Sequence, residues 1–276
     1  MAEPAPRRRS EIAPAKINLA LHVRGKLPDG RHALETVFAF CIEGDRLEGW
    51  LQPGDEKLSL SVKGPFGAAI EGANLIERAW SLMRTSVGHA GGGTTVIELD
   101  KLLPIASGIG GGSADAAAAL RLMTALWNAD PAHAEAVAPM LGSDVPACLL
   151  SMSCRGDGAG DRLELCDPGI AGLSVLLVNP RAALATGEVF ARWDGVDRGP
   201  LGDWRSGRND LEPPARALVP AIGDVLDWLS TQPGSTATRM SGSGATCFAL
   251  FETVEARDEA ASSCPTNWWH LASTLR

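Results

Sequence analysis

The sequence predicts an α+β fold. Segments with strand periodicity and segments with helix periodicity come in clusters, without the regular alternation that builds a doubly wound parallel sheet. The chain has 276 residues, 45% of them hydrophobic, so it can bury a sizeable core in one domain or in two. A segment rich in glycine and aspartate, 155–162, is the candidate domain boundary.

The first half of the chain opens with strands. Residues 15–23 alternate between apolar and polar side chains, which predicts a strand with Lys16, Asn18 and His22 on its polar face. Further apolar runs predict strands at 36–42, 47–51, 58–62 and 95–99. Apolar residues at helical spacing predict a helix over 74–87, which the glycines at 88 and 91–93 end.

The second half mixes helices and strands. Helices are expected over 116–127, 130–141, 188–193, 220–230 and 254–263. Residues 142–146 form a tight turn before the apolar segment 147–150, and 195–209 is a polar loop. A buried strand is expected at 173–178, a strand–turn–strand unit at 238–251, and a short final strand after the last helix.

A glycine-rich segment, 104–115, leads directly into the alanine-rich helix at 116–127. Glycines let backbone N–H groups approach an anion, and the start of a helix adds unpaired N–H groups and a positive dipole end. Ser113 is expected to cap the helix, with Asp115 in its first turn. The alternative is an ordinary helix entry, but four glycines within five residues exceed what a cap needs, so the segment favours a phosphate site.

Two familiar nucleotide motifs do not fit this segment. A P-loop requires Gly-Lys followed by Ser or Thr, and the chain contains no such triplet. The dinucleotide-binding fingerprint requires a glycine where Ser113 stands. The segment therefore predicts a nucleotide site of another kind.

Charge, cysteine spacing and the lengths of apolar runs argue against several classes of protein and several cellular locations. A net charge of −8 argues against non-specific nucleic-acid binding. The six cysteines lack the spacing of a zinc or redox site and are expected to be reduced. The basic residues near the start are followed by no apolar segment typical of a signal peptide, and no run is long enough to cross a membrane. We therefore expect a cytoplasmic protein with no nucleic-acid or membrane partner.

Two residues form a candidate pair for phosphoryl transfer. Lys16 lies on the polar face of the first strand, and Asp144 lies in the turn at 142–146. Each taken singly is better explained as a structural residue. Together with a phosphate loop, an aspartate beside a lysine could orient a hydroxyl while the lysine holds developing charge. A second glycine turn, 241–245, is either a hairpin or another wall of the site.

The motifs of this chain resemble those of the GHMP kinases, which include galactokinase, homoserine kinase and mevalonate kinase. The similarity lies in three segments, 14–19, the loop at 104–115 and 241–246, which follow one another in the order found in the family. Segments 29–36, 74–76, 142–146 and 209–212 resemble the branch that acts on a cytidyl diphosphate of methylerythritol. The matches span about residues 12 to 251.

The resemblance implies a two-domain fold, with a nucleotide-binding N-terminal domain at 1–156, a C-terminal domain at 157–276 and the active site in a cleft between them. It implies ATP-dependent phosphorylation of the 2-hydroxyl of 4-diphosphocytidyl-2-C-methyl-D-erythritol, in non-mevalonate isoprenoid biosynthesis. ATP and Mg²⁺ are then the cofactors, and the protein is a monomer or a homodimer. The alternatives are another GHMP small-molecule kinase, of homoserine or sugar type, and a catalytically silent nucleotide-binding regulator.

The resemblance also implies residue roles. Lys16 and Asp144 match catalytic positions, and Ser113 is a metal ligand by analogy only. Residues expected at the nucleotide are Asn74, Lys101, Pro104, Ser107, Gly108, Gly110, Gly111, Gly112 and Ser113. Residues expected at the cytidyl substrate are Asn18, Arg31, His32, Asp144, Thr186, Phe190 and Gly242.

Arg31 departs from the family pattern. It stands where the family usually places a tyrosine against the cytosine ring, and this chain has no tyrosine. A guanidinium plane can also stack on a base. We therefore expect either Arg31 or Phe190 to supply the face on which the base lies.

Overall fold

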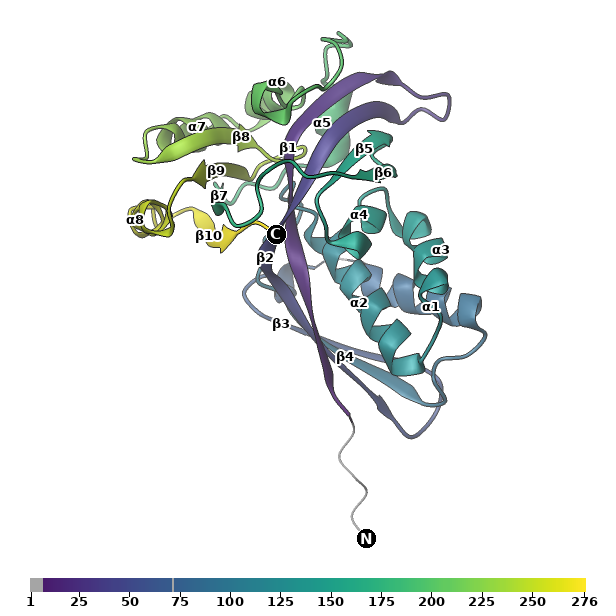
Figure 1. Cartoon of the computed structure of the whole chain (residues 1–276). Coiled ribbons are helices and arrows are strands. Elements are labelled where there is room, and N and C mark those ends of the chain that lie inside the picture. The colour runs from purple at the N-terminus through teal and green to yellow at the C-terminus, as the bar shows by residue number, and fades with distance from the viewer. Residues whose placement is uncertain (1–6, 71) are drawn as a thin grey trace. The chain divides into compact units, whose positions relative to one another are not determined.

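The computed structural model describes residues 7–70 and 72–276. The chain forms two compact units, and each is built from segments that are far apart in the sequence (Figure 1). Among the described residues, unit 1 contains 7–14, 44–70, 72–105 and 111–150. Unit 2 contains 15–43, 106–110 and 151–276. A division of the chain into domains at 156/157 stays a prediction beside these interleaved units.

Unit 1 combines a sheet with a helical layer. The long strands β1 (Arg9–Lys26) and β2 (His32–Gln52) contribute residues to both units. The second half of β2 pairs antiparallel with β4 (Thr94–Asp100), which pairs parallel with β3 (Leu58–Lys63). The helices of this unit are α1 (Leu75–Val87), α2 (Gly111–Trp127), α3 (Pro131–Leu141), α4 (Val145–Leu150) and the short 3₁₀ helix η1 (Gly67–Ala69).

The helical layer of unit 1 is organised around α2. This helix contacts α1, α3, α4 and β4, and its alanines from 114 to 119 are fully buried. Small side chains let neighbouring helices approach closely, so an alanine-rich helix suits the centre of the layer. In Figure 1 the four helices lie together on one side of β3 and β4.

Unit 2 contains a hairpin and a separate antiparallel sheet. The hairpin consists of β5 (Cys154–Gly158) and β6 (Arg162–Leu165), which pair antiparallel with each other. Strand β5 also pairs antiparallel with the first half of β2. The sheet has the order β10-β7-β9-β8, from Trp269–Thr274, Ser174–Asn179, Cys247–Phe251 and Ser235–Met240. The helices of unit 2 are α5 (Thr186–Ala191), the short 3₁₀ helix η2 (Trp204–Ser206), α6 (Glu212–Leu218), α7 (Ala221–Ser230) and α8 (Val254–Ser262).

The core of unit 2 lies between this sheet and its helices. Helices α7 and α8 contact the strands of the sheet, as Figure 1 also shows. Leu176 and Val178 of β7 and Phe251 of β9 belong to one buried cluster with Ile222 and Val225 of α7. These residues alternate along each strand, as expected where one face is buried.

Some elements differ from the predictions made from the sequence. The runs at 36–42 and 47–51 are strand as predicted, but they form one continuous strand, β2, which passes through Gly44 and Asp45 without a turn. Segment 155–162, the candidate domain boundary, lies in the β5–β6 hairpin, and a boundary there stays a prediction. Helix α6 was missed, since two prolines at its start obscured the helical pattern. Among the described residues, no helix is long and apolar enough to cross a bilayer.

Candidate active site

Lys16 is held in unit 2 by a chain of buried hydrogen bonds. Its ammonium donates to Asn18 Oδ1 (3.0 Å), and Asn18 Nδ2 donates to Thr36 Oγ1 (2.8 Å). Thr36 in turn donates to the carbonyl of Ala20 (2.6 Å). Lys16 is only 3% exposed and also lies over the ring of Phe38. The lysine predicted from the strand pattern is therefore fixed in one position rather than solvated.

The two glycine turns meet backbone to backbone within unit 2. The hydroxyl of Ser241 donates to the carbonyl of Gly108 (3.0 Å) and accepts the N–H of Asn18 (3.2 Å). A Cβ at Gly108 would lie 2.4 Å from the Ser241 carbonyl oxygen, and one at Gly242 would lie 2.8 Å from that of Gly108. Glycine is thus required at both positions for close packing, whatever ligand they also bind.

The backbone of the glycine loop is also tied to β1. The N–H of Lys16 donates to the carbonyl of Ile109 (3.0 Å), and the carbonyl of Ser107 accepts the N–H of Thr246 (3.0 Å). Gly110 has a positive φ of 67°, a conformation that side chains disfavour. Unit 2 therefore brings Lys16, Asn18, Gly242 and the loop segment 106–110 together.

Helix α2 begins earlier than the sequence indicates. It starts at Gly111, so Ser113 lies inside its first turn and is not the cap, and Asp115 lies beyond that turn. Glycines weaken the helical signal, which is why the pattern placed the start at Ala116. The backbone N–H groups of Gly111, Gly112 and Ser113 are those that a helix start leaves unpaired.

Asp144 lies in unit 1, immediately before α4. The turn predicted at 142–146 is confirmed by a hydrogen bond from the N–H of Val145 to the carbonyl of Gly142 (3.2 Å). The carbonyl of Asp144 accepts the N–H of Cys148 (3.0 Å), so this residue starts the helix, and its side chain is half-buried. Lys16 belongs to unit 2, and the pairing of these two residues stays a prediction.

Asn74 has a clear structural role in unit 1. Its side-chain oxygen accepts the N–H of Ile76 (2.9 Å), and its own N–H donates to Glu77 (3.1 Å), which forms a capping box at the start of α1. The position expected near adenosine is therefore fixed by the helix start. The side chain of Pro104, which is also expected at the nucleotide, is buried.

The ammonium of Lys101 is enclosed in a buried ion network. It donates to Asp45 (2.5 Å) and Asp115 (2.7 Å), and each of the three side chains is at most 4% exposed. Burial alone would lower the pKa of Lys101, but the two carboxylates raise it above its usual value. Removing one partner of such a buried pair typically costs about 3–5 kcal/mol. The ammonium is thus occupied by protein carboxylates.

Asp115 keeps a proton over an unusual pH range. Burial raises the pKa of this carboxyl to about 8; the charge of Asp45 adds to the rise and Lys101 opposes it. Between pH 3.8 and about 8, the unfolded chain has released this proton while the folded chain retains it. The free energy of unfolding therefore falls as the pH rises through this range, by at most about 1.4 kcal/mol per pH unit.

We expect Asp115→Asn to remove this pH dependence, because the amide resembles the protonated carboxyl. Urea unfolding of both proteins at about pH 5 and about pH 8 measures it. The wild type should lose more stability between the two pH values than the variant does. Equal losses would show that Asp115 ionises normally in the folded protein.

An aromatic cluster surrounds His32 in unit 2. The imidazole stacks on Phe190 with ring centroids 4.7 Å apart, and Trp193 contacts it edge-on at 5.6 Å. Burial and the charge of Lys26 lower the pKa of His32, so the ring is neutral at physiological pH. His32 Nε2 and Trp193 Nε1 are buried with no hydrogen-bond partner among the described residues.

Arg31 and Thr186 have partners of their own. The guanidinium of Arg31 forms ion pairs with Asp29 (2.8 Å) and Asp161 (3.0 Å), although its side chain is 54% exposed. The hydroxyl of Thr186 is hydrogen-bonded to that of Ser243 in the second glycine turn (2.9 Å). The plane of Arg31 is therefore already oriented by two carboxylates.

Two family profiles match the chain, and curated relatives cover nearly all of it. The profile "GHMP kinases N terminal domain" matches residues 74–152, and "GHMP kinases C terminal" matches 197–269. A protein of Rhizorhabdus wittichii named 4-diphosphocytidyl-2-C-methyl-D-erythritol kinase is 50% identical, over 97% of this chain and 94% of the relative. One of the same name from Novosphingobium aromaticivorans is 49% identical, over 96% and 92%.

The chain belongs to the GHMP kinase family. Solved GHMP kinases also share its fold. A crystal structure of 4-(cytidine 5'-diphospho)-2C-methyl-D-erythritol kinase has a TM-score of 0.81 at 32% identity, covering 97% of this chain and 99% of the other. Homoserine kinase from Cytophaga hutchinsonii has a TM-score of 0.72 at 16% identity, covering 100% and 97%, and shares the fold alone. The predicted α+β GHMP kinase fold is confirmed.

Sequence reasoning missed several residues of this GHMP kinase. Asp45 and Thr36 both lie inside the long strand β2, where no pattern marks them as partners of Lys101 and Asn18. Trp193 gave a weak signal, since an aromatic residue follows Phe190 by three positions, on the same side of a helical turn. Ser243 gave none.

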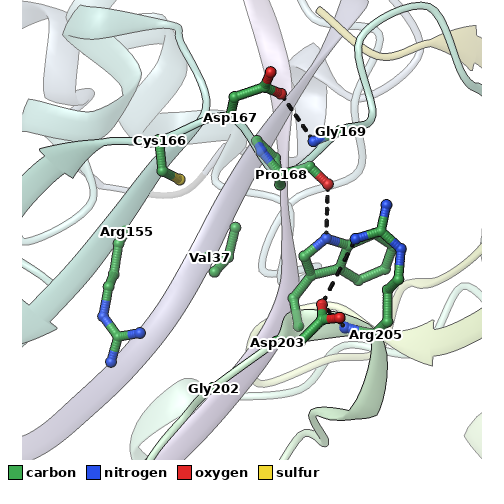
Figure 2. A pocket seen from close by; sticks show the side chains of 10 residues that line it. Val37, Arg155, Cys166, Asp167, Pro168, Gly169, Gly202, Asp203 and Arg205 are labelled. Carbon is green, nitrogen blue, oxygen red and sulfur yellow. Dashed lines mark hydrogen bonds and ion pairs between the residues drawn. The ribbon is translucent and has the colours of Figure 1, made fainter.

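A pocket of about 360 Å³ in unit 2 lies outside the predicted site residues. Figure 2 shows its lining, in which the indole N–H of Trp204 donates to the carbonyl of Pro168 (2.9 Å) and Arg205 lies beside the same ring. Trp204 is only 6% exposed. In this GHMP kinase the indole ring of Trp204 therefore contacts Arg205, and its N–H is hydrogen-bonded to Pro168. The pocket offers no unpaired indole N–H to a ligand.

Proposed function

We propose that this GHMP kinase transfers the γ-phosphoryl group of ATP to the 2-hydroxyl of 4-diphosphocytidyl-2-C-methyl-D-erythritol, in the cytoplasmic non-mevalonate route to isoprenoid precursors. The observation that carries the proposal is the 50% identity, over 97% of the chain, to a relative named for this reaction. Such identity over nearly full length supports a shared substrate more strongly than a shared fold does.

In this proposal, Asp144 orients the acceptor hydroxyl and takes its proton as the bond to phosphorus forms. Lys16 stabilises the charge that develops on the transferred group, and ADP leaves with the bridging oxygen. The buried chain from Lys16 through Asn18 to Thr36 supports this role, because a lysine held in one place needs no reorganisation during the reaction.

The phosphates of ATP are proposed to bind at the start of α2 and along the loop from Ser107 to Ser113. The unpaired N–H groups of the helix start and the positive φ of Gly110 fit an anion. Asn74, Lys101 and Pro104 would then lie on the adenosine side. The ammonium of Lys101 is occupied by Asp45 and Asp115, so it does not bind the nucleotide directly in this proposal.

Mg²⁺ is proposed to bind mainly through the phosphates of ATP. Among the described residues, no group of three His, Cys, Asp or Glu side chains is arranged to hold a metal ion. Mg²⁺ commonly keeps several waters and takes only one or two protein ligands beside nucleotide phosphates, so this donor set fits it. Ser113 is a candidate ligand through its hydroxyl. The ion would neutralise charge on the phosphates when bound.

The cytidyl group is proposed to bind near His32 and Phe190, with Asn18, Thr186 and Gly242 along the rest of the substrate. A neutral, partly buried imidazole stacked on a phenyl ring offers both an aromatic face and polar atoms for a base. Release of ADP, measured with a panel of alcohols with and without the cytidyl diphosphate group, tests the whole proposal. Turnover of homoserine or a sugar, and not of the cytidyl substrate, would contradict it.

Arg31→Ala and Phe190→Ala separate the two candidate stacking faces. We expect Phe190→Ala to raise KM for the cytidyl substrate by about 5–150-fold, since base–aromatic stacking is worth about 1–3 kcal/mol. Arg31→Ala should also raise this KM more than the KM for ATP, because it removes a planar group from the same site. Steady-state kinetics with each substrate varied in turn measure both. Equal effects on the two KM values would argue against base stacking.

A further inference from the structure

The segment that carries the proposed phosphate site has both of its ends attached to one buried ammonium in unit 1. Before the segment, the Oδ1 atom of Asp45 accepts the N–H groups of Leu102 (2.5 Å) and Leu103 (2.8 Å), while its Oδ2 accepts Lys101. After the segment, Asp115 of α2 accepts the same lysine. One ammonium therefore joins the chain on the two sides of residues 104–110.

Gly111 lies directly against this ion network. A Cβ built on Gly111 would be 3.0 Å from Lys101 Nζ and 3.8 Å from Asp45 Oδ2. The helix start, whose N–H groups the proposed function assigns to phosphates, thus rests on the ammonium. A shift of Nζ would leave space beneath Gly111, and the first turn of α2 could move into it.

Lys101 is also fixed through its backbone. Its N–H donates to the carbonyl of Lys63 at the end of β3 (2.8 Å), and its carbonyl accepts the N–H of Phe66 (3.2 Å). Burial is nearly complete for Lys101, Asp45 and Asp115, so solvent does not screen their attraction. Lys101 is thus held both by its side chain and by its backbone.

We propose that Lys101, Asp45 and Asp115 are positioning residues for nucleotide binding, because their ion network holds the start of α2 in the shape that accepts phosphate. None of the three touches the phosphates through its side chain. The inference rests on the proposed function, since it assigns the network to the ATP site of that reaction. It assigns Lys101 an indirect action through Gly111 rather than direct contact with the nucleotide by its ammonium.

The test separates positioning from simple stability. Lys101→Met removes the ammonium that donates to both Asp45 and Asp115, leaves the two buried acids facing each other, and should lower the melting temperature. The double variant Lys101→Met with Asp115→Asn replaces one of the two facing acids by a neutral amide, which can donate a hydrogen bond to the other, and should recover part of that loss. Lys57→Met, on the exposed surface of unit 1, is the matched control for loss of a lysine charge and should bind ATP as the wild type does.

ATP affinity is measured by calorimetry on the full-length proteins, together with KM for ATP and kcat. If the network positions the helix start, both Lys101→Met and the double variant weaken ATP binding by about 10–100-fold. Loss of a residue that orients a metal ligand in a metalloprotein weakens metal binding by a similar factor. The loss then persists in the double variant although its stability recovers, and kcat at saturating ATP changes less than KM.

Recovery of wild-type ATP affinity along with stability in the double variant would overturn the proposal. If Lys101→Met fails to fold, the double variant and Asp45→Asn decide between the same two outcomes. Failure of the wild type itself to bind ATP would overturn the proposed function instead. Wild-type binding with unchanged affinity in the folded variants would overturn only the positioning role.

Discussion

Replacing Asp144 with alanine is expected to lower kcat by about 10²–10⁴-fold while ATP affinity stays unchanged. This range is usual for a group positioned to accept a proton in the transition state. The carboxylate follows a tight turn at the start of α4, where its backbone is fixed by the N–H of Cys148. Alanine fits the same backbone, so the fold should persist. Steady-state kinetics with the cytidyl substrate and calorimetry with ATP measure the two effects.

Two further variants make this result specific. Asp144→Asn keeps the size of the side chain but accepts no proton, and it should lose kcat to a similar extent. Asp227→Ala removes an exposed carboxylate from α7 and should leave kcat unchanged. Turnover within a few-fold of the wild type in Asp144→Ala would remove this residue from the proposed mechanism.

Gly110→Val is expected to abolish measurable ATP binding. Gly110 has a φ of 67°, and a β-branched residue there is strained by about 1–3 kcal/mol. The side chain would also crowd N–H groups next to the proposed phosphates. Each charge-assisted hydrogen bond lost should weaken binding by about 10–150-fold. Calorimetry with ATP measures the change, and the melting temperature reports the strain separately.

A second glycine controls for strain alone. Gly88 ends α1 with a φ of 86°, and no atom lies within 4 Å of a Cβ placed there. Gly88→Val should therefore lower the melting temperature and keep ATP affinity. Gly110→Asn, which tolerates this backbone conformation better, should weaken binding less than valine does. Near-wild-type affinity in Gly110→Val would place the phosphate site elsewhere.

Local patterns predicted most of the elements of this fold. Alternation in 15–23 located the polar face with Lys16 and Asn18, and helical spacing located α1 and α7 within two residues. The predictions failed where local preference and tertiary packing disagree. Glycines at the start of α2 and prolines at the start of α6 weaken the helical signal, but packing in the folded protein overrides it.

The candidate site was harder to predict than the fold. Lys16, Asn18 and the glycine turns carry recognisable motifs, and unit 2 brings them together through hydrogen bonds. The partners of Lys101 carry no such signal. Asp45 is separated from it by 56 positions, and a buried acid within a strand cannot be told from a surface acid by periodicity. The role of this lysine therefore emerged only from its surroundings.

The interleaving of the two units has a consequence for synthesis of the chain. Asn18, in the first strand, bonds to Ser241, which lies 223 positions later. At about 5–20 residues per second, roughly 10–45 s pass between the appearance of these two partners. Meanwhile Leu21 and Val23 of the first strand lack the later residues with which they form the buried cluster of unit 2. This kinase should therefore depend on chaperones during translation more than a protein whose domains follow one another along the chain.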